Sequence, residues 1–388
     1  MRNKKIKQIV EKFLISLTFL NKYIPKNEKQ IVLYSNLGFR DNVKALYDYL
    51  IENRYYEQYH IICATNESKQ YKKINKNALF VSPIIGLYYY LRSKYFFYSF
   101  GKYPIYPSKR QIVVNLWHGM PLKKIGLLSE TEKDLKYNFF TYVLATSEFF
   151  KPVMAKVFGC SEKQVIITGE PRNDALFKKV NISNYFNINE NNKKIIYMPT
   201  FRYSADLMID NSGSKDTVYE KLKDKKVLVE LNNELFRKNI ILFIKPHPLD
   251  NFDKLFIEHL SNIFYITDEI LNKKNITLYT FLGNMDALIT DYSSVYFDYL
   301  LLNKPIGFVV DDIDNYEEKR GFVIDNPLNI MPGEKIKDLD GLNKFFENLF
   351  NDVDEFIGER KVVNDLVNRY KDENNCRRLL KILKIIKL

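Results

Sequence analysis

Two of the four histidines lie in short loops rich in Gly, Pro and Lys. His118 lies in the run NLWHGMPLK and His247 in the run IKPHP, and each run follows an apolar segment typical of a buried strand. An imidazole can take a proton from a hydroxyl or hydrogen-bond a phosphate oxygen. We therefore predict one site, made of two halves far apart in the chain, that binds a phosphorylated ligand.

The residues after His118 have the composition of an anion-binding loop. Gly119 lets backbone amides approach a phosphate, Pro121 stiffens the turn and Lys123 adds positive charge. A helix beginning there would point the positive end of its dipole at the phosphate. The alternative is a core histidine beside Trp117, and the neighbouring Gly, Pro and Lys make it the weaker interpretation.

The loop around His247 is short and rigid. Pro246 and Pro248 restrict its backbone and fix the direction of the imidazole. Lys245, beside a fixed histidine, suits a pyrophosphate. The alternative is a loop that only joins two elements.

Polar side chains in two further loops could contact the same ligand. In the run GEPRND, Arg172 could hold a phosphate through two parallel hydrogen bonds, and Glu170 could be a base or an ion-pair partner. In the run MPTFR, Thr200 and Arg202 suit a phosphate or a ribose, with an ordinary charged loop as the alternative.

The run TDYSSVYFDY places hydroxyl groups where a helix should begin. The amides and hydroxyls of Ser293 and Ser294 would form an anion-binding helix end, with Asp291 beside them. Helix capping accounts for one serine but leaves the second without a role. Asp298 falls within the helix, and we expect it to meet an Arg or Lys across a cleft.

Strands alternate with helical spans along the whole chain, which predicts an α/β fold with parallel sheets covered by helices. The apolar runs end just before His118, Thr200, His247 and Asp291, so these residues follow strand ends. The predicted strands are Ile31–Ser35, His60–Ala64, Leu79–Val81, Tyr95–Ser99, Gln111–Leu116, Tyr142–Thr146, Gln164–Thr168, Lys194–Met198, Ile240–Lys245, Ala287–Asp291 and Ile306–Val310.

The length of 388 residues favours two domains, and the 46% hydrophobic content can fill two cores. We expect a basic N-terminal helix in residues 1–28, Rossmann-like domains in 29–185 and 186–355, and a long basic helix in 356–388. The polar run 181–194 is the expected linker. Two doubly wound domains would place their functional loops at strand carboxyl ends, facing a central cleft.

The net charge of +12 favours a polyanionic partner such as nucleic acid, anionic lipid or a phosphate-rich substrate. The lysines are dispersed and no nucleic-acid-binding motif accompanies them, so we expect no nucleic acid partner. Cys63, Cys160 and Cys376 are too far apart for a disulfide framework or a zinc site, which indicates a reducing cytoplasm.

Several well-known site motifs are missing from the sequence. It contains no P-loop, no GxGxxG run and no HExxH run, which disfavours a P-loop kinase, a dinucleotide-dependent dehydrogenase and a zincin. Asp312 and Asp314 have the spacing of a divalent-cation pair, but acidic turn residues account for them. We expect no cofactor and no metal.

Apolar residues recur at helical spacing near the N-terminus, among lysines. This pattern predicts either a basic amphipathic helix on an anionic membrane surface or a helix packed on the domain. No apolar run is long enough to span a bilayer. The apolar positions are Ile6, Ile9, Val10, Phe13, Leu14, Leu17 and Leu20.

The runs WHGMPLKK, GEPRND, MPTFR, KPHP and TDYSSVYFDY, in this order, resemble the CDP-glycerol glycerophosphotransferase family of teichoic acid synthesis. The resemblance extends from about Ile31 to Phe350, and the stretch that holds Tyr316, Arg320 and Asp325 also fits. One departure is Met120, since Thr is frequent at this position of the family's HGTP loop.

The resemblance implies a GT-B-like fold with an acceptor domain in 29–185 and a CDP-donor domain in 186–355. It implies transfer of glycerol phosphate from CDP-glycerol, or of a related group from another CDP-polyol, with release of CMP. The acceptor would be a hydroxyl of a polyprenyl-diphosphate-linked saccharide or of poly(glycerol phosphate). The enzyme would be peripheral, at the cytoplasmic face of the cell membrane, in teichoic acid or capsule-type polymer synthesis.

Carried over from the family, His118 and His247 would be two essential histidines. Our mechanistic hypothesis makes His118 the base that takes the acceptor's proton. His247, Arg202, Ser293 and Ser294 would hold the pyrophosphate, with Asp291 orienting them.

Two other classes remain as alternatives. A GT-B sugar-nucleotide glycosyltransferase of surface polysaccharide assembly would share the architecture. A non-catalytic protein that binds membranes or nucleic acid would account for the charge and the N-terminal helix, but not for the paired histidine loops.

Overall fold

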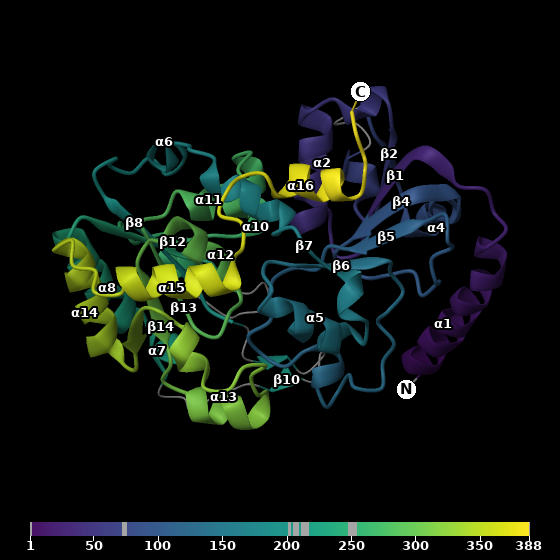
Figure 1. The fold of residues 1–388 in the computed structure, drawn as a ribbon. Coiled ribbons are helices and arrows are strands. Elements are labelled where there is room, and N and C mark those ends of the chain that lie inside the picture. Colours follow the sequence, from purple (N-terminus) through teal and green to yellow (C-terminus); the bar gives the residue numbers. More distant parts are fainter. Residues whose placement is uncertain are drawn as a thin grey trace. The chain divides into compact units, whose positions relative to one another are not determined.

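The computed structural model describes residues 2–71, 76–200, 203–204, 209–210, 217–246 and 254–387, which form two compact units (Figure 1). Unit 1 comprises Met1–Met120, Ile125–Asp174 and Arg369–Leu388. Unit 2 comprises Pro121–Lys124 and Ala175–Asn368. Each unit is therefore assembled from segments that are separated in the sequence.

Unit 1 is built on a seven-stranded parallel sheet in the order β3-β2-β1-β4-β5-β6-β7. The middle of each long strand is apolar and buried, as in Ile31–Leu33 of β1, because helices cover both faces of such a sheet. The strands are β1 Asn27–Ser35, β2 His60–Thr65, β3 Leu79–Val81, β4 Ser93–Tyr98, β5 Ile112–Asn115, β6 Tyr142–Ala145 and β7 Val165–Ile167. The helices are α1 Arg2–Asn21, α2 Asp41–Glu52, α3 Ser68–Tyr71, α4 Pro83–Arg92, α5 Phe150–Phe158 and α16 Asn375–Ile382, with 3-10 turns η1 Tyr55–Glu57, η2 Gly126–Leu128 and η3 Glu162–Gln164.

One core of unit 1 lies between β1, α2 and α16. Val43, Leu46 and Leu50 recur at helical spacing along α2 and are fully buried. Leu379 and Leu380 of α16 belong to the same cluster. The last helix therefore completes a core begun by the first strand.

Unit 2 repeats this plan in a six-stranded parallel sheet of order β12-β11-β8-β13-β14-β15. The strands are β8 Lys193–Met198, β11 Ile240–Ile244, β12 Ile263–Tyr265, β13 Ala287–Thr290, β14 Ile306–Val309 and β15 Glu334–Ile336, with a small antiparallel pair β9 Tyr203–Ser204 and β10 Ile209–Asp210. The helices are α6 Ile182–Phe186, α7 Val218–Lys221, α8 Lys225–Arg237, α9 Lys254–Ile257, α10 Asp268–Lys273, α11 Leu278–Gly283, α12 Val295–Tyr299, α13 Ile313–Lys319, α14 Leu339–Phe350 and α15 Ile357–Val367, with 3-10 turns η5 Leu300–Leu302 and η6 Pro327–Ile330. The 3-10 segment η4 Pro171–Phe177 spans the division between the two units.

In both sheets the strand order reverses beside the first strand, between β1 and β4 and between β8 and β13. Ligands of doubly wound sheets bind outside the strand carboxyl ends at such reversals. The predicted α/β class with two parallel sheets is confirmed. The sequence did not reveal β12 or β15, which are edge strands of three residues each.

The two units divide at Asp174 and Ala175, ahead of the expected boundary at 185/186. The chain joins unit 2 early because Leu176 is fully buried there, with its backbone against Gly283 of α11. Asn284 then holds the carbonyl of Lys178 at 2.8 Å. The polar run that suggested a linker contains α6 instead.

The prediction of a single C-terminal helix in 356–388 is wrong. The chain forms α15 in unit 2 and α16 in unit 1. Asn368 breaks the helix because its backbone is extended and its side chain donates to the carbonyl of Phe297 at 2.7 Å. The amide of Arg369 then bonds the carbonyl of Thr146 in unit 1 at 2.9 Å.

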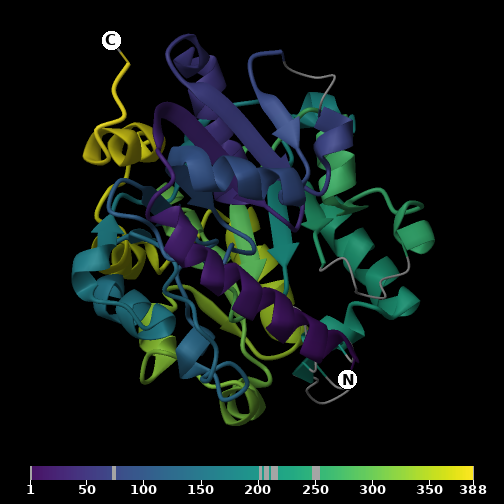
Figure 2. The same cartoon turned by 90° about the vertical axis from the view of Figure 1, so that its right-hand side faces the viewer.

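Helix α1 runs along the outside of unit 1 (Figure 2). Its C-terminal end is fixed because buried Asn21 donates to the carbonyl of Tyr106 at 3.0 Å. Its outer face is apolar and open to solvent, with Phe13 60% and Leu20 53% exposed. Among the described residues, no helix is both long and apolar enough to cross a bilayer.

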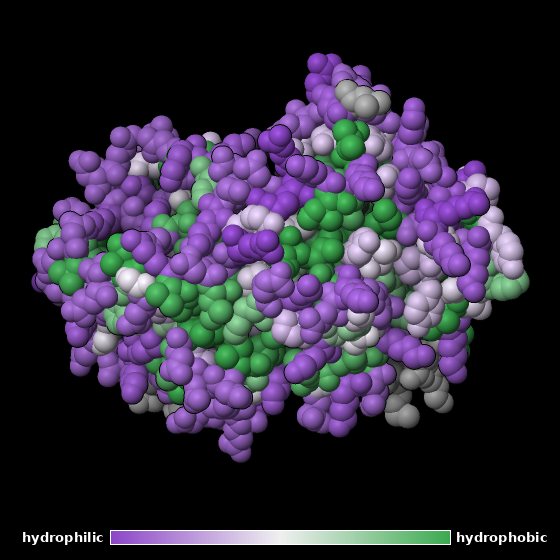
Figure 3. All heavy atoms as spheres, in the orientation of Figure 1, coloured by the Kyte–Doolittle hydropathy of each residue, from purple (hydrophilic) through white to green (hydrophobic). Residues whose placement is uncertain are grey.

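The surface shown in Figure 3 is mostly hydrophilic, with separate hydrophobic areas. One such area lies along α15, where Val362 is 70% and Leu366 42% exposed. Apolar side chains of this kind are ordinary on a protein surface when they are scattered.

Candidate functional site

The loops after β1, β4 and β5 of unit 1 come together around His118. Asn42 follows β1, Phe100 follows β4, and His118 itself follows β5. The ring of Phe100 stacks on the imidazole with the centroids 4.8 Å apart and the planes 12° from parallel. His118 therefore lies beside the reversal of strand order in its own sheet, as expected for a ligand site.

The backbone turns sharply at His118. Trp117 has a φ of +57° and Gly119 a φ of +125°, so residues with positive φ stand on both sides of the histidine. Glycine adopts such a conformation freely, whereas a bulky L residue does so at a cost of about 1–2 kcal/mol. The amide of Trp117 bonds the side chain of Asn115 at 3.0 Å, which helps to hold the turn.

The His118 imidazole is half-buried against two aromatic rings, since its centroid lies 3.8 Å from that of Trp117 and 4.8 Å from that of Phe100. Burial lowers the pKa of His118 to about 4, with nearby Asp41 opposing the shift and Arg172 adding to it. The imidazole is therefore neutral at pH 7 and able to accept a proton.

Arg172 and Glu170 form an ion pair, with the Arg172 Nε 2.7 Å from the Glu170 carboxylate. Arg172 also meets Asp41 at 2.8 Å and donates to the carbonyl oxygen of His118 at 2.9 Å. Glu170 is fully buried and Arg172 only 6% exposed. Of the roles left open for Glu170, this geometry favours the ion-pair partner, and it favours support of the His118 turn for Arg172.

The helix that we expected directly after His118 does not form in residues 119–124, all of which the structure describes. Pro121–Lys124 belongs to unit 2, where Lys123 forms an antiparallel bridge with Phe322. The amide of Lys124 bonds the carbonyl of Gly321 at 3.0 Å, so these residues are extended and cannot begin a helix. Gly119 stays with His118 in unit 1, whereas Lys123 is built into unit 2.

In unit 2, Thr200 and Asp291 join the carboxyl ends of β8 and β13. Both carboxylate oxygens of Asp291 accept from the Thr200 amide, at 3.0 and 2.9 Å, and one accepts from its hydroxyl at 2.8 Å. Both residues are buried. Asp291 thus fixes the start of the MPTFR loop at the point where the strand order reverses.

Ser293 and Ser294 lie at the start of α12, as predicted, and both are partly exposed. Asp298 of the same helix is buried, and the Tyr279 hydroxyl donates to it at 2.7 Å. Asp298 therefore has a partner inside unit 2, and a cation across a cleft is not needed to account for its burial.

Lys245 follows β11, and its ammonium group lies 2.9 Å from the carboxylate of Asp268 at the start of α10. His247 and Arg202, the other two predicted ligands of the pyrophosphate, lie outside the described residues. The His247 half of the predicted site therefore remains a prediction.

The sequence left Asp41, Asn42 and Phe100 without a role, although the structure places all three around His118. The available signal was position, because each of the three follows a strand next to the reversal of strand order.

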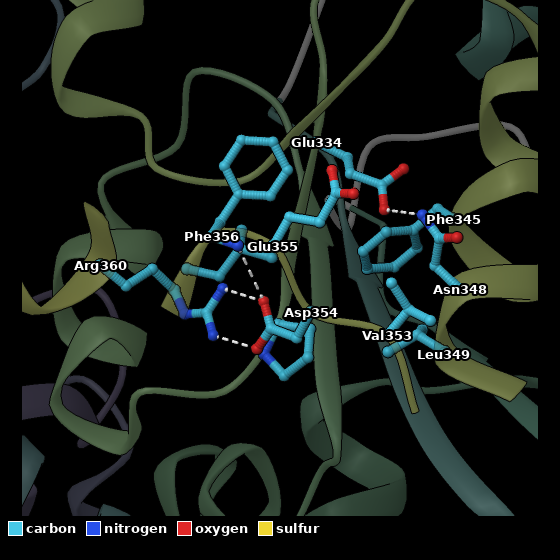
Figure 4. Close-up of a pocket in the computed structure, with 11 residues that line it drawn as sticks. Glu334, Phe345, Asn348, Leu349, Val353, Asp354, Glu355, Phe356 and Arg360 are labelled. Carbon is cyan, nitrogen blue, oxygen red and sulfur yellow. Dashed lines mark hydrogen bonds and ion pairs between the residues drawn. The ribbon is translucent and has the colours of Figure 1, made fainter. Parts of the chain in front are cut away.

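A small cavity of about 10 Å³ lies in unit 2, away from these loops (Figure 4). It has room for about one water molecule. Arg360 of α15 and Asp354 form a two-bond ion pair at its wall, with one bond of 2.9 Å. This pair joins α15 to the turn before it, and Arg360 also donates to the carbonyl of Asn303 at 3.4 Å. Within the described ranges, no group of three or more His, Cys, Asp and Glu side chains could hold a metal ion.

Unit 1 thus holds a neutral histidine at a strand end, and unit 2 holds Thr200 and Asp291 joined at the ends of two strands. The profile of the CDP-Glycerol:Poly(glycerophosphate) glycerophosphotransferase family matches residues 16–384. The chain belongs to this family. It is therefore an enzyme of the CDP-glycerol glycerophosphotransferase type, and the family predicted from the motif order is confirmed.

Members of the glycerophosphotransferase family resemble the chain over most of its length. The teichoic acid glycerol-phosphate primase of Bacillus subtilis (strain 168) is 28% identical over 96% of this chain and 95% of its own. The teichoic acid poly(glycerol phosphate) polymerase of Bacillus spizizenii is 30% identical over 78% of this chain and 79% of its own.

A solved structure of the wall teichoic acid polymerase TagF, soaked with CDPG, matches the fold. It superposes with a TM-score of 0.74 at 22% identity, covering 98% of this chain and 95% of that chain. This match confirms the GT-B-like fold that was predicted for this chain.

Proposed function

We propose that this protein transfers glycerol phosphate from CDP-glycerol to a hydroxyl of a lipid-linked saccharide or a poly(glycerol phosphate) chain, with release of CMP. The observation that carries the proposal is His118 in a chain of this family. Its imidazole is neutral, lies against aromatic rings and follows a strand at a strained turn. The primase similar to the chain over nearly its whole length supports glycerol phosphate as the transferred group.

In the proposed reaction the acceptor hydroxyl oxygen forms a bond to the glycerol-side phosphorus of the donor. The bond from that phosphorus to the bridging oxygen breaks, and CMP leaves with the bridging oxygen and its electron pair. The hydroxyl proton goes to His118, whose lowered pKa keeps it neutral before the reaction.

The residues of unit 2 are proposed to hold the donor. His247, Arg202, Ser293 and Ser294 would hold the pyrophosphate, as preorganised donors that stabilise developing charge. Lys123 and Lys245 would add ammonium contacts, and Gly119, which belongs to unit 1, would add a backbone contact. The Asp291 bonds to Thr200 support a role for Asp291 in orienting this loop.

Two single variants test the proposal. We expect His118→Ala and His247→Ala each to lower CMP release from CDP-glycerol by about 100-fold or more, since general acid–base catalysis contributes about 10²–10⁴-fold. Release is measured with a lipid-linked saccharide acceptor, and the product is identified by its mass.

Exposed His259 offers a matched control, and His259→Ala should turn over normally. Near-normal turnover in His118→Ala or His247→Ala would remove that residue from the mechanism. Turnover with UDP- or CMP-sugars in place of CDP-polyols would replace the proposal with the sugar-nucleotide glycosyltransferase. A ribitol product from CDP-ribitol would change the transferred polyol but keep the chemistry.

We also propose that the protein works at the cytoplasmic face of the cell membrane, bound through α1. An acceptor that carries a polyprenyl chain stays in the bilayer, so the enzyme must reach it there. The exposed side chains of Ile9, Phe13 and Leu20 and the neighbouring lysines support a peripheral contact with anionic lipid.

A further inference from the structure

One fully buried amide side chain joins three segments next to His118. The Asn42 Nδ2 donates to the carbonyl oxygens of Leu116 and Trp117, at 3.2 and 3.1 Å. Its Oδ1 accepts from the backbone amide of Arg172 at 3.0 Å. Both donor hydrogens and the acceptor of this amide are therefore used, which only an Asn or Gln side chain can do.

The two carbonyl groups that Asn42 binds belong to the strained turn. The carbonyl of Trp117 is part of the peptide bond that leads into His118, so Asn42 fixes the plane of that peptide. The Arg172 Nη1 bonds the carbonyl of His118 itself at 2.9 Å and fixes the next plane. The positive φ of Trp117 persists because these contacts hold the backbone on both sides.

We infer that Asn42 is a positioning residue, which sets the direction of the His118 imidazole by holding the two peptide groups before it. The inference rests on the proposed function, since it matters for catalysis only if His118 is the base. Asn42 acts as a donor, so a side chain of the same shape without those donors should release the turn.

Asn42→Asp is the decisive variant because its carboxylate is nearly isosteric but turns oxygen atoms toward the two carbonyl oxygens. Asn53→Asp is the matched control, since Asn53 follows the other end of α2, is exposed, and its side chain donates to the carbonyl of Tyr49 at 2.9 Å. Asn42→Ser, which keeps one donor, serves if Asn42→Asp fails to fold.

The first measurement is positional and does not depend on activity. With ¹³C-labelled histidine the chain gives four imidazole signals, and the one missing in His118→Ala identifies His118. We expect Asn42→Asp to move the signal and titration midpoint of His118 while the signal of His60, in β2 of the same unit, stays in place. An unmoved His118 signal in both Asn42 variants would overturn the inference.

The second measurement is kinetic. We expect Asn42→Asp to lower kcat by about 100-fold, as a misplaced catalytic group does, with the KM for CDP-glycerol nearly unchanged. In the His118→Ala background the same substitution should cause no further loss. A further loss there of similar size would overturn the inference, because Asn42 would then act independently of His118.

The two measurements separate the inference from the function on which it rests. If His118→Ala keeps full turnover, the proposed function fails, while the shift of the His118 signal still decides whether Asn42 positions it. If His118→Ala is inactive and Asn53→Asp is as slow as Asn42→Asp, the function stands and the inference fails.

Discussion

His118 combines two properties that conflict in most histidines: it lies against aromatic rings, yet in the proposed mechanism it takes a proton. Enclosure lowers the pKa of His118 to about 4, against an ordinary value of 6.5. The neutral form is the form that accepts a proton, so it is fully available at neutral pH. A nearby substrate phosphate would raise this pKa and strengthen the base.

This pKa predicts the acid side of the pH profile. We expect kcat/KM for CMP release, which reports the free enzyme, to be constant from neutral pH down to about 5 and to fall as pH drops through about 4. Phe100→Leu removes the stacked ring, so its profile should fall at a higher pH, nearer 6.5.

The profile is measured at pH values where circular dichroism shows the fold intact. A wild-type acid limb already near 6.5 would show that the aromatic enclosure does not desolvate the imidazole. An identical limb in Phe100→Leu would show that Phe100 has no part in it.

The sequence predicted His118 and its strand, because a Gly-flanked histidine after an apolar run is a local signal. It could not predict the role of Asn42, whose partners Leu116 and Arg172 are 74 and 130 residues away in the chain. Arg172 was assigned to a phosphate for the same reason, since its ion-pair partner Asp41 is 131 residues distant. Only the tertiary fold shows which charges already have partners.

At the scale of elements, α1 is held at one end and exposed along its outer face. Of the two alternatives considered for this helix, packing on unit 1 is observed through Asn21, whereas membrane binding stays a prediction, supported by the exposure of Phe13 and Leu20. Amphipathic spacing alone does not say which face is covered, since packing and membrane binding need the same pattern.

We expect Phe13→Ser to weaken binding to vesicles of phosphatidylglycerol and phosphatidylcholine by about 10- to 100-fold, since burying one large apolar side chain contributes about 1.5–3 kcal/mol. Binding is measured by co-sedimentation, and added salt should weaken it because lysines flank the apolar face.

Ser16→Ala is the control on the same exposed helix, because it leaves the apolar side chains intact. Equal binding of Phe13→Ser and the wild type would exclude the outer face of α1 as the membrane contact.

At the scale of the molecule, each unit has its own core, and the last helix serves the first unit. The sequence predicted two doubly wound halves from their strand periodicity, but it assigned α16 to one long terminal helix. The break at Asn368 was not predictable, because it depends on a bond to Phe297, 71 residues away.

This arrangement predicts which unit loses stability when α16 is changed. Leu379 is fully buried against β1 and α2, so Leu379→Ala should destabilise unit 1 by about 2–5 kcal/mol. Hydrogen exchange should then accelerate in β1, β2 and β4, while β8, β11 and β13 of unit 2 keep their protection.

Ile382→Ala, on the same helix but 46% exposed, should leave exchange nearly unchanged in both units. Faster exchange confined to unit 2 in Leu379→Ala would contradict the assignment of α16 to unit 1.

The discontinuity of unit 1 has a consequence for biosynthesis. A ribosome delivers β1 and α2 early but α16 only with the final residues of this sequence, so nascent unit 1 waits with part of its core uncovered. Unit 2, whose main segment ends at Asn368, has its whole sheet translated before α16 appears. Synthesis of unit 1 therefore starts before that of unit 2 and ends after it. A chaperone that binds exposed apolar surface would bind the uncovered core of nascent unit 1.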